Sequence, residues 1–134
     1  HHTTNMAKGI RELVRVCKKG GNIWLYLYGS GGLFWEARKE MNRFMKLIPR
    51  KYAEEILKLI GLPNNRWIFM DTWYVPIEKH STHKEVYSIL KKENVKIIEK
   101  MKKGNNFDLE TSINKTKNGS KIWGEGDIRL MITK

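Results

Sequence analysis

One sequence feature limits the possible folds of this chain more than any other. It is a predicted helix that two glycines separate from an unbroken apolar segment. Apolar residues recur at helical spacing over residues 10–17, and Gly20-Gly21 ends that pattern. Residues 23–28 then read Ile-Trp-Leu-Tyr-Leu-Tyr. An apolar run without alternation is typical of a central strand that is covered on both faces. Together these segments predict part of a parallel α/β sheet.

Two further helices are predicted after this strand, over residues 34–48 and 51–60. The apolar positions that define them are Phe34, Ala37, Met41, Phe44 and Ile48 in the first helix, and Tyr52, Ile56, Leu59 and Ile60 in the second. Residues 64–80 lack such a period and are expected to be irregular. They hold four aromatic residues, so we expect them to pack over another part of the molecule.

The last third of the chain predicts one helix and two strands. Thr82-His83-Lys84-Glu85 has the form of a capping box, which starts a helix. Apolar residues over 95–101 and 128–133 indicate strands, and the polar stretch between them contains the turn signal Asn118-Gly119. We expect these two strands to form an antiparallel hairpin at the edge of the sheet.

Composition indicates a globular domain. The chain has 134 residues, of which 40% are hydrophobic and 10% are aromatic, and a disordered chain would lack so many aromatic side chains. The single cysteine, Cys17, cannot form an internal disulfide, and no cysteine cluster suits a metal site. No apolar run approaches the length of a membrane span, and no signal pattern is present. We therefore expect a cytoplasmic protein without stable membrane insertion and without a bound metal.

The net charge of +12 requires an explanation, because strongly basic small domains often bind nucleic acids through phosphate contacts. The excess consists mainly of lysines that are scattered along the sequence, which favours a solvated surface. The alternative is a basic RNA-binding module that uses tryptophan and tyrosine rings to stack on bases.

The segment Gly29-Ser30-Gly31-Gly32 lies between a predicted strand and a predicted helix, where phosphate-binding loops occur. It lacks the G-x-G-x-x-G spacing, a following Gly-Lys-Ser/Thr and an acidic residue about 20 positions later. We therefore interpret it as a turn.

The N-terminal residues carry a pattern of their own. His1-His2-Thr3 is followed by Arg11-Glu12-Leu13 and then by Lys19-Gly20-Gly21. This order resembles class I S-adenosylmethionine-dependent methyltransferases, in which a strand ends in a His-His-Thr loop and a helix then leads through Lys-Pro-Gly-Gly into the next strand. Lys19 stands where proline is usual, and Cys17 stands in place of leucine. The alternative is that His1-His2 is the remnant of an affinity tag and that Met6 is the initiator.

The resemblance extends weakly through Trp123–Arg129 and so spans residues 1–134. It implies the C-terminal portion of a Rossmann-like methyltransferase domain, with strands five to seven of its sheet and inserted helices. The glycine-rich loop and the acidic residue that hold S-adenosylmethionine would lie upstream of His1, in the missing N-terminal half of the domain. We therefore expect the isolated segment to be inactive, and unstable or self-associating, because one strand edge would be uncovered.

The resemblance also implies site residues. His1, His2 and Thr3 would border the methyl donor, and either histidine would orient an unidentified acceptor or remove its proton. The alternative role for one of these histidines is a hydrogen bond to the loop backbone. Tyr28 and Gly29 would form part of the pocket wall at the carboxyl end of a strand.

Residues 33–80 come where this family often inserts a cap over the acceptor. Trp73, Tyr74 and His80 would then contact the substrate, although aromatic side chains commonly only pack. A further alternative is peripheral attachment to a membrane through the helix over residues 34–48, which pairs an aromatic face with four basic residues.

Overall fold

The computed structural model describes residues 1–62, 66–93, 95–100 and 117–134, which form two compact units. Residues 1–34 and 77–134 make the first unit, and residues 35–76 make the second. The elements are α1 (Met6–Val16), β1 (Asn22–Gly29), α2 (Gly32–Met45), α3 (Arg50–Leu59), α4 (Arg66–Tyr74), β2 (His80–Ser81), α5 (His83–Lys92), β3 (Lys96–Lys100), α7 (Gly119–Trp123) and β4 (Asp127–Thr133).

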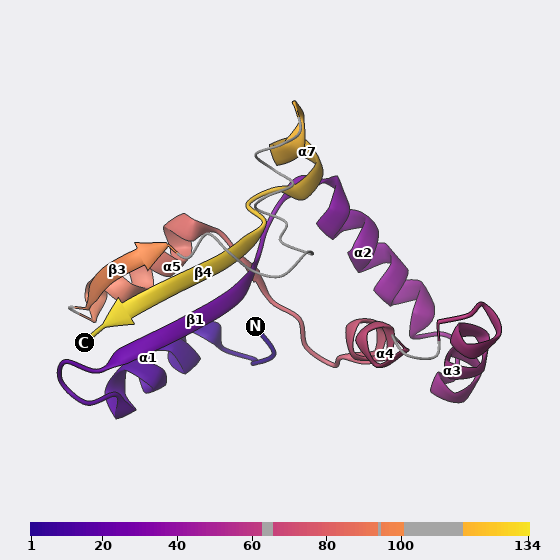
Figure 1. The fold of residues 1–134 in the computed structure, drawn as a ribbon, viewed down its shortest axis with the longest axis horizontal. Helices are drawn as coiled ribbons and strands as arrows, with labels where there is room; N and C mark the ends of the chain where they lie inside the picture. The colour runs from indigo at the N-terminus through magenta and orange to yellow at the C-terminus, as the bar shows by residue number, and fades with distance from the viewer. Residues whose placement is uncertain (63–65, 94, 101–116) are drawn as a thin grey trace. The chain divides into compact units, whose positions relative to one another are not determined.

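The first unit is a mixed α/β structure with an open sheet in the order β2-β1-β4-β3 (Figure 1). Strand β4 is antiparallel to both of its neighbours, β1 and β3. The predicted antiparallel pairing of the last two strands is therefore confirmed. The predicted parallel sheet is represented, within the described residues, only by the two-residue pairing of β1 with β2. Along most of its length β1 pairs with β4, which is antiparallel to it, and not with the parallel strand that was expected.

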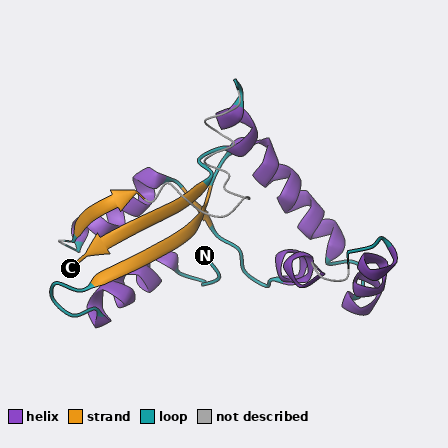
Figure 2. Ribbon diagram, viewed as in Figure 1, coloured by secondary structure: helices purple, strands orange, loops and turns teal. Residues whose placement is uncertain are grey.

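Helices α1 and α5 lie on the same face of this sheet (Figure 2). The core between them and the strands consists of Ile10, Val14, Leu25, Leu27, Val86, Leu90, Ile128, Leu130 and Ile132. The expectation that β1 is buried on both faces is wrong, because its burial alternates and Trp24 is 58% exposed. The two helices cover only the face that carries Leu25 and Leu27.

The ends of the two helices follow the local sequence signals. The Asn5 side chain accepts a hydrogen bond from the backbone N–H of Lys8 and so caps α1. After α1, Gly20 takes a φ of 77°, a conformation that favours glycine. At α5 both hydrogen bonds of the predicted capping box are formed, between Thr82 and Glu85. These signals were sufficient to place both helices.

The second unit contains α3, α4 and most of α2 around a small core of Met45, Ala53, Leu57 and Met70. The expectation of an irregular segment over 64–80 is wrong, because α4 forms within it and packs Met70 into this core. The expected buried faces of the earlier helices are also wrong in detail. Helix α2 buries Trp35 and Met45 and α3 buries Ala53 and Leu57, which are positions next to the predicted ones.

Two findings concern the rest of the chain. The turn signal at Asn118-Gly119 leads into the short helix α7, for which Asn118 is the N-cap residue. Residues 101–116 of the predicted polar stretch lie outside the described residues. Within the described part of the chain, no helix has both the length and the apolar character needed to cross a lipid bilayer.

Candidate functional site

The candidate site is built around the carboxyl end of β1. Tyr28 and Gly29 are the last residues of this strand, and they pair with His80 and Ser81 of β2. The backbone N–H of Gly29 donates a 2.7 Å hydrogen bond to the carbonyl oxygen of Gly126. A Cβ atom at position 29 would overlap that oxygen, so the close approach of the two backbones requires glycine.

The N-terminal residues reach this same end of the strand. The rings of His1 and Tyr28 stack with centroids 4.0 Å apart, and the ring of His2 lies 4.2 Å from that of His1. The carbonyl oxygen of His1 accepts a hydrogen bond from the backbone N–H of Lys79. The structure therefore brings together His1, His2, Tyr28 and Gly29, which sequence reasoning had placed in one site.

Each of the first three residues has a different polar environment. The His2 Nδ1 atom lies 3.0 Å from the carbonyl oxygen of Ile77, so Nδ1 donates and Nε2 is left as the basic nitrogen of a neutral ring. The Nδ1 atom of His1 is buried and has no hydrogen-bond partner. Thr3 instead accepts a hydrogen bond from the N–H of Asn5, which is a local role at the start of α1.

His80 is held by two acceptors. Its Nδ1 atom lies 2.8 Å from the carbonyl oxygen of Gly29, and its Nε2 atom lies 2.9 Å from a carboxylate oxygen of Glu78. Because a carbonyl oxygen only accepts, Nδ1 must carry a proton. The second contact then requires another proton, either on Nε2 or on the carboxyl group. The geometry therefore fits either an imidazolium beside the Glu78 carboxylate or a neutral ring that accepts from a protonated Glu78 carboxyl group.

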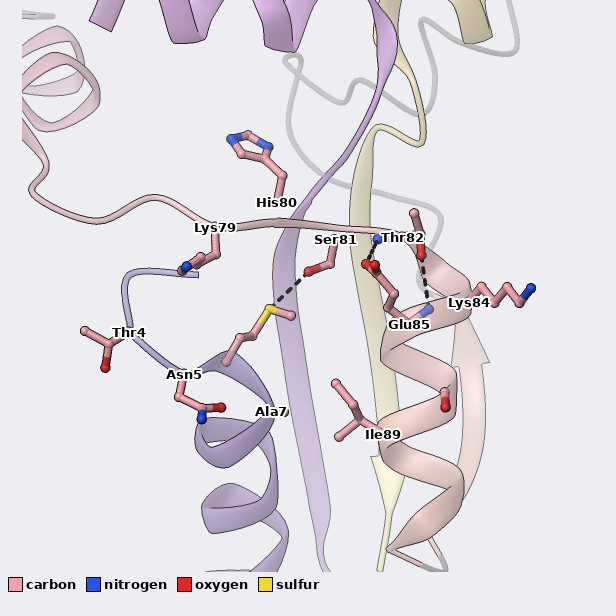
Figure 3. A pocket seen from close by; sticks show the side chains of 12 residues that line it. Thr4, Asn5, Ala7, Lys79, His80, Ser81, Thr82, Lys84, Glu85 and Ile89 are labelled. Atoms are coloured by element: carbon pink, nitrogen blue, oxygen red, sulfur yellow. Dashed lines mark hydrogen bonds between the residues drawn. The ribbon is translucent and has the colours of Figure 1, made fainter. Parts of the chain in front are cut away.

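A cavity of about 770 Å³ lies beside this cluster, between the first turns of α1 and α5 (Figure 3). The residues that line it are Thr4, Asn5, Met6, Ala7, Lys79, His80, Ser81, Thr82, Lys84, Glu85, Ser88 and Ile89. The buried hydroxyl of Ser81 donates to the sulfur of Met6 across it. The side chains of Lys84 and His80 point away from the middle of the cavity.

A buried ion pair lies on β4 at the level of the same rings. The guanidinium of Arg129 bonds to the carboxylate of Asp127 at 3.0 Å, and both residues are buried. Arg129 also lies over the ring of Tyr26, at 5.4 Å from its centroid. Burial, reinforced by the nearby Asp127 carboxylate, raises the pKa of Tyr26 to about 12. Tyr26 is therefore a neutral hydrogen-bonding phenol at physiological pH.

Sequence reasoning missed several of these groups. Asp127 directly precedes the strand predicted over residues 128–133, and Arg129 lies within it, so the two alternate with apolar residues. This alternation indicates that both side chains lie on the face opposite the core. His83 and Glu125 form a second histidine–carboxylate pair, with the ring Nδ1 atom 2.7 Å from the carboxylate. No spacing rule connects residues so far apart in the sequence, nor does one connect His80 to Gly29.

Trp73 and Tyr74 belong to the second unit. Trp73 packs with Phe69, and the Tyr74 hydroxyl donates a 2.7 Å hydrogen bond to the carbonyl oxygen of Ile48. Both side chains thus support the core of that unit, and their contact with an acceptor stays a prediction. The compact unit 35–76 lies within the segment 33–80 that was expected as an insertion.

The glycine turn after β1 has a packing explanation. Gly32 and Gly124 have φ values of 79° and 59°, and a Cβ atom on either would overlap the backbone of the opposite turn. This close approach supports the interpretation of residues 29–32 as a turn. Among the described residues, no three His, Cys, Asp or Glu side chains are grouped so that they could hold a metal ion.

Comparison of the chain with family models, with curated proteins and with solved structures found no match.

Proposed function

We propose that this chain is the C-terminal part of an S-adenosylmethionine-dependent methyltransferase and forms part of its acceptor site. The observation that carries the proposal is the cluster of His1, His2, Tyr28 and His80 around Gly29. These residues come from three separate segments and meet at the carboxyl end of β1. In open α/β sheets, ligands bind at that edge.

The order of strands supports the proposal. Strands β1, β3 and β4 follow one another as the fifth, sixth and seventh strands of the resembling family would, and β3 pairs antiparallel with β4. On its second edge, β1 pairs only through Tyr28 and Gly29, so residues 22–27 have no strand partner there within the described chain. The proposal assigns this edge to a strand that precedes His1.

The polar groups around His1 suit a bound methyl donor. The buried Nδ1 atom of His1 has no partner, and a polar group of a ligand beside Tyr28 would satisfy it. When bound, S-adenosylmethionine supplies a methyl group on a positively charged sulfur, which needs no further activation. The chain must then hold the acceptor in line and, where needed, remove its proton.

His2 is the best placed residue for removing that proton. Its Nδ1–H bond to the carbonyl oxygen of Ile77 fixes the ring and leaves Nε2 as a base. His80 has a different role in this proposal, because both of its ring nitrogens are engaged. It holds β2 against the end of β1 through its hydrogen bond to the carbonyl oxygen of Gly29.

The coding sequence upstream of His1 tests this proposal. Over about 100 codons we expect an apolar strand, a glycine-rich loop, a helix and a second strand that ends in a carboxylate, which together bind the donor. A stop codon directly upstream, with Met6 as the first residue, would contradict the methyltransferase proposal for this product.

A single-stranded RNA-binding module is the second candidate, and the exposed ring of Trp24 favours it. This ring is nearly parallel to that of Tyr26, with centroids 6.0 Å apart, on the sheet face that α1 and α5 leave uncovered. Exposed aromatic rings on a basic domain can stack on bases. Strongly salt-dependent binding of a labelled oligonucleotide, lost in Trp24→Ala, would support this candidate. Equal binding by wild type and Trp24→Ala would contradict it.

A further inference from the structure

The second unit exposes an apolar face that its own core does not use. Tyr52, Ile56, Leu59 and Ile60 lie at i, i+4, i+7 and i+8 along α3 and its last turn, so they share one side of the helix. All four are exposed, and Leu59 is 85% exposed. The core of the unit is contacted instead by Ala53 and Leu57, from the adjacent side. We call the four exposed residues the α3 stripe.

Exposed apolar residues are concentrated in this unit. Nine of the thirteen large hydrophobic residues that are exposed in the described chain lie within residues 35–76. They include Leu47 just after α2, which is 79% exposed, and Trp67 in α4. A typical surface helix has one apolar side, whereas α3 has its core contacts and the α3 stripe as well. Such an excess of exposed apolar surface indicates a binding surface.

Charge identifies the kind of partner. Residues 35–76 contain eight Lys and Arg residues against five Asp and Glu residues, so the unit is positively charged. Four of the basic residues form ion pairs with an acid three or four positions away on the same helix. Lys46 and Lys51 have no acidic partner among the described residues. Lys51 lies next to the α3 stripe, with its ammonium 4.9 Å from the centre of the Tyr52 ring.

We propose that the α3 stripe binds the surface of an anionic lipid membrane. Helix α3 would lie in the plane of the interface, with Ile56, Leu59 and Ile60 among the upper acyl carbons and Tyr52 at the level of the headgroups. Lys46 and Lys51 would contact the lipid phosphates and carboxylates. A second copy of the chain fits this surface less well, because its positive charge would repel an identical unit. The proposal does not depend on methyl transfer.

Vesicle flotation with the full chain tests the proposal. We expect the protein to float with vesicles of phosphatidylcholine and phosphatidylserine, to bind phosphatidylcholine alone more weakly, and to be released by salt. Because burying a leucine favours the apolar phase by a factor of about ten or more, Leu59→Glu should lower the affinity at least about tenfold. The matched control is Val16→Glu in α1, where an aliphatic residue that is also largely exposed, at 64%, lies outside the second unit.

Three results would overturn the proposal. The first is a wild-type chain that stays unbound with both kinds of vesicle. The second is equal loss of binding in Leu59→Glu and Val16→Glu. The third comes from sedimentation without lipid, where conversion of a wild-type dimer to a monomer by Leu59→Glu, without flotation of the wild type, would assign the α3 stripe to a second copy of the chain. Circular dichroism of both variants shows whether they keep the wild-type helix content.

Discussion

Alanine at position 29 is expected to open the junction between β1 and the entry to β4. The N–H of Gly29 donates to the carbonyl oxygen of Gly126 at 2.7 Å, and the new Cβ atom would overlap that oxygen. The carbonyl carbon of Glu125 lies only 3.0 Å from the same Cβ position. Both obstacles are backbone atoms, so no side-chain rotation can relieve the clash, and the two backbones must separate.

The cost follows from the two effects together. A lost hydrogen bond costs about 1 kcal/mol, and forced separation of packed groups costs about 1–3 kcal/mol, so we expect Gly29→Ala to lower the free energy of unfolding by about 2–4 kcal/mol. Urea denaturation followed by circular dichroism measures this change. The same variant should shift the imidazole NMR signals of His80, because the Nδ1 atom of that ring donates to the carbonyl of Gly29.

Gly9→Ala is the matched control. Gly9 lies inside α1, and its added Cβ would make an ordinary contact of 3.6 Å with the methyl group of Thr3. Alanine is favoured over glycine in a helix by about 1 kcal/mol, so this variant should be more stable than the wild type. If Gly29→Ala has the same urea midpoint of unfolding as the wild type, the assigned contact between the two backbones is refuted.

Three other predictions concern the core, a helix cap and a titrating group. Leu130→Ala empties a fully buried site and should cost about 2–5 kcal/mol in urea denaturation, whereas a cost below about 1 kcal/mol would contradict its place in the core. Thr82→Ala removes the capping box of α5 and should cost about 1 kcal/mol by the same assay, and an unchanged midpoint would contradict the cap. The raised pKa of Tyr26 stabilises the fold fully below about pH 10, and this contribution is lost as pH rises to about 12, because the unfolded chain ionises first. Absorbance titration should therefore lose its latest tyrosine step in Tyr26→Phe, and retention of that step would exclude Tyr26 as its source.

Local signals account for the elements that the sequence predicted well. Asn5, Gly20 and the pair Thr82 and Glu85 each form a hydrogen bond or a turn within a few residues, so their roles do not depend on the rest of the fold. The positions of α1, β1 and α5 therefore follow from the sequence. Spacing also gave the helical character of α2 and α3, but it could not decide which apolar side meets the core.

Tertiary packing explains the features that could not be predicted from the sequence, namely α4, the buried side of α3 and the alternating burial of β1. The residues of α4 show no regular apolar period in the sequence, and the helix forms where Met70 and Trp73 pack on the neighbouring helices. In α3, Ala53 and Leu57 are buried whereas Leu59 is exposed. The reason is that α2 and α4 pack against the side of α3 that carries Ala53 and Leu57. The alternation of burial in β1 likewise depends on α1 and α5 covering a single face.

In the candidate site, too, some residues could be predicted from the sequence, whereas other contacts form only in the folded chain. Resemblance suggested His1, His2, Tyr28 and Gly29, and the structure places them in contact around one strand end. The contact of His80 with the carbonyl oxygen of Gly29 follows from the pairing of β2 with β1, and residue spacing alone does not indicate it. Pairs such as His83 with Glu125 join segments more than 40 positions apart, so only the folded chain reveals them.

Binding of S-adenosylhomocysteine, the demethylated donor, tests the central claim most directly. The polypeptide that includes the residues encoded upstream of His1 is titrated by calorimetry, beside the same polypeptide with His1→Ala. Saturable binding that weakens in the variant is the result we predict, because the buried Nδ1 atom of His1 would lose its ligand partner. Absence of binding by the folded wild-type polypeptide would contradict the assignment of this chain to a methyltransferase.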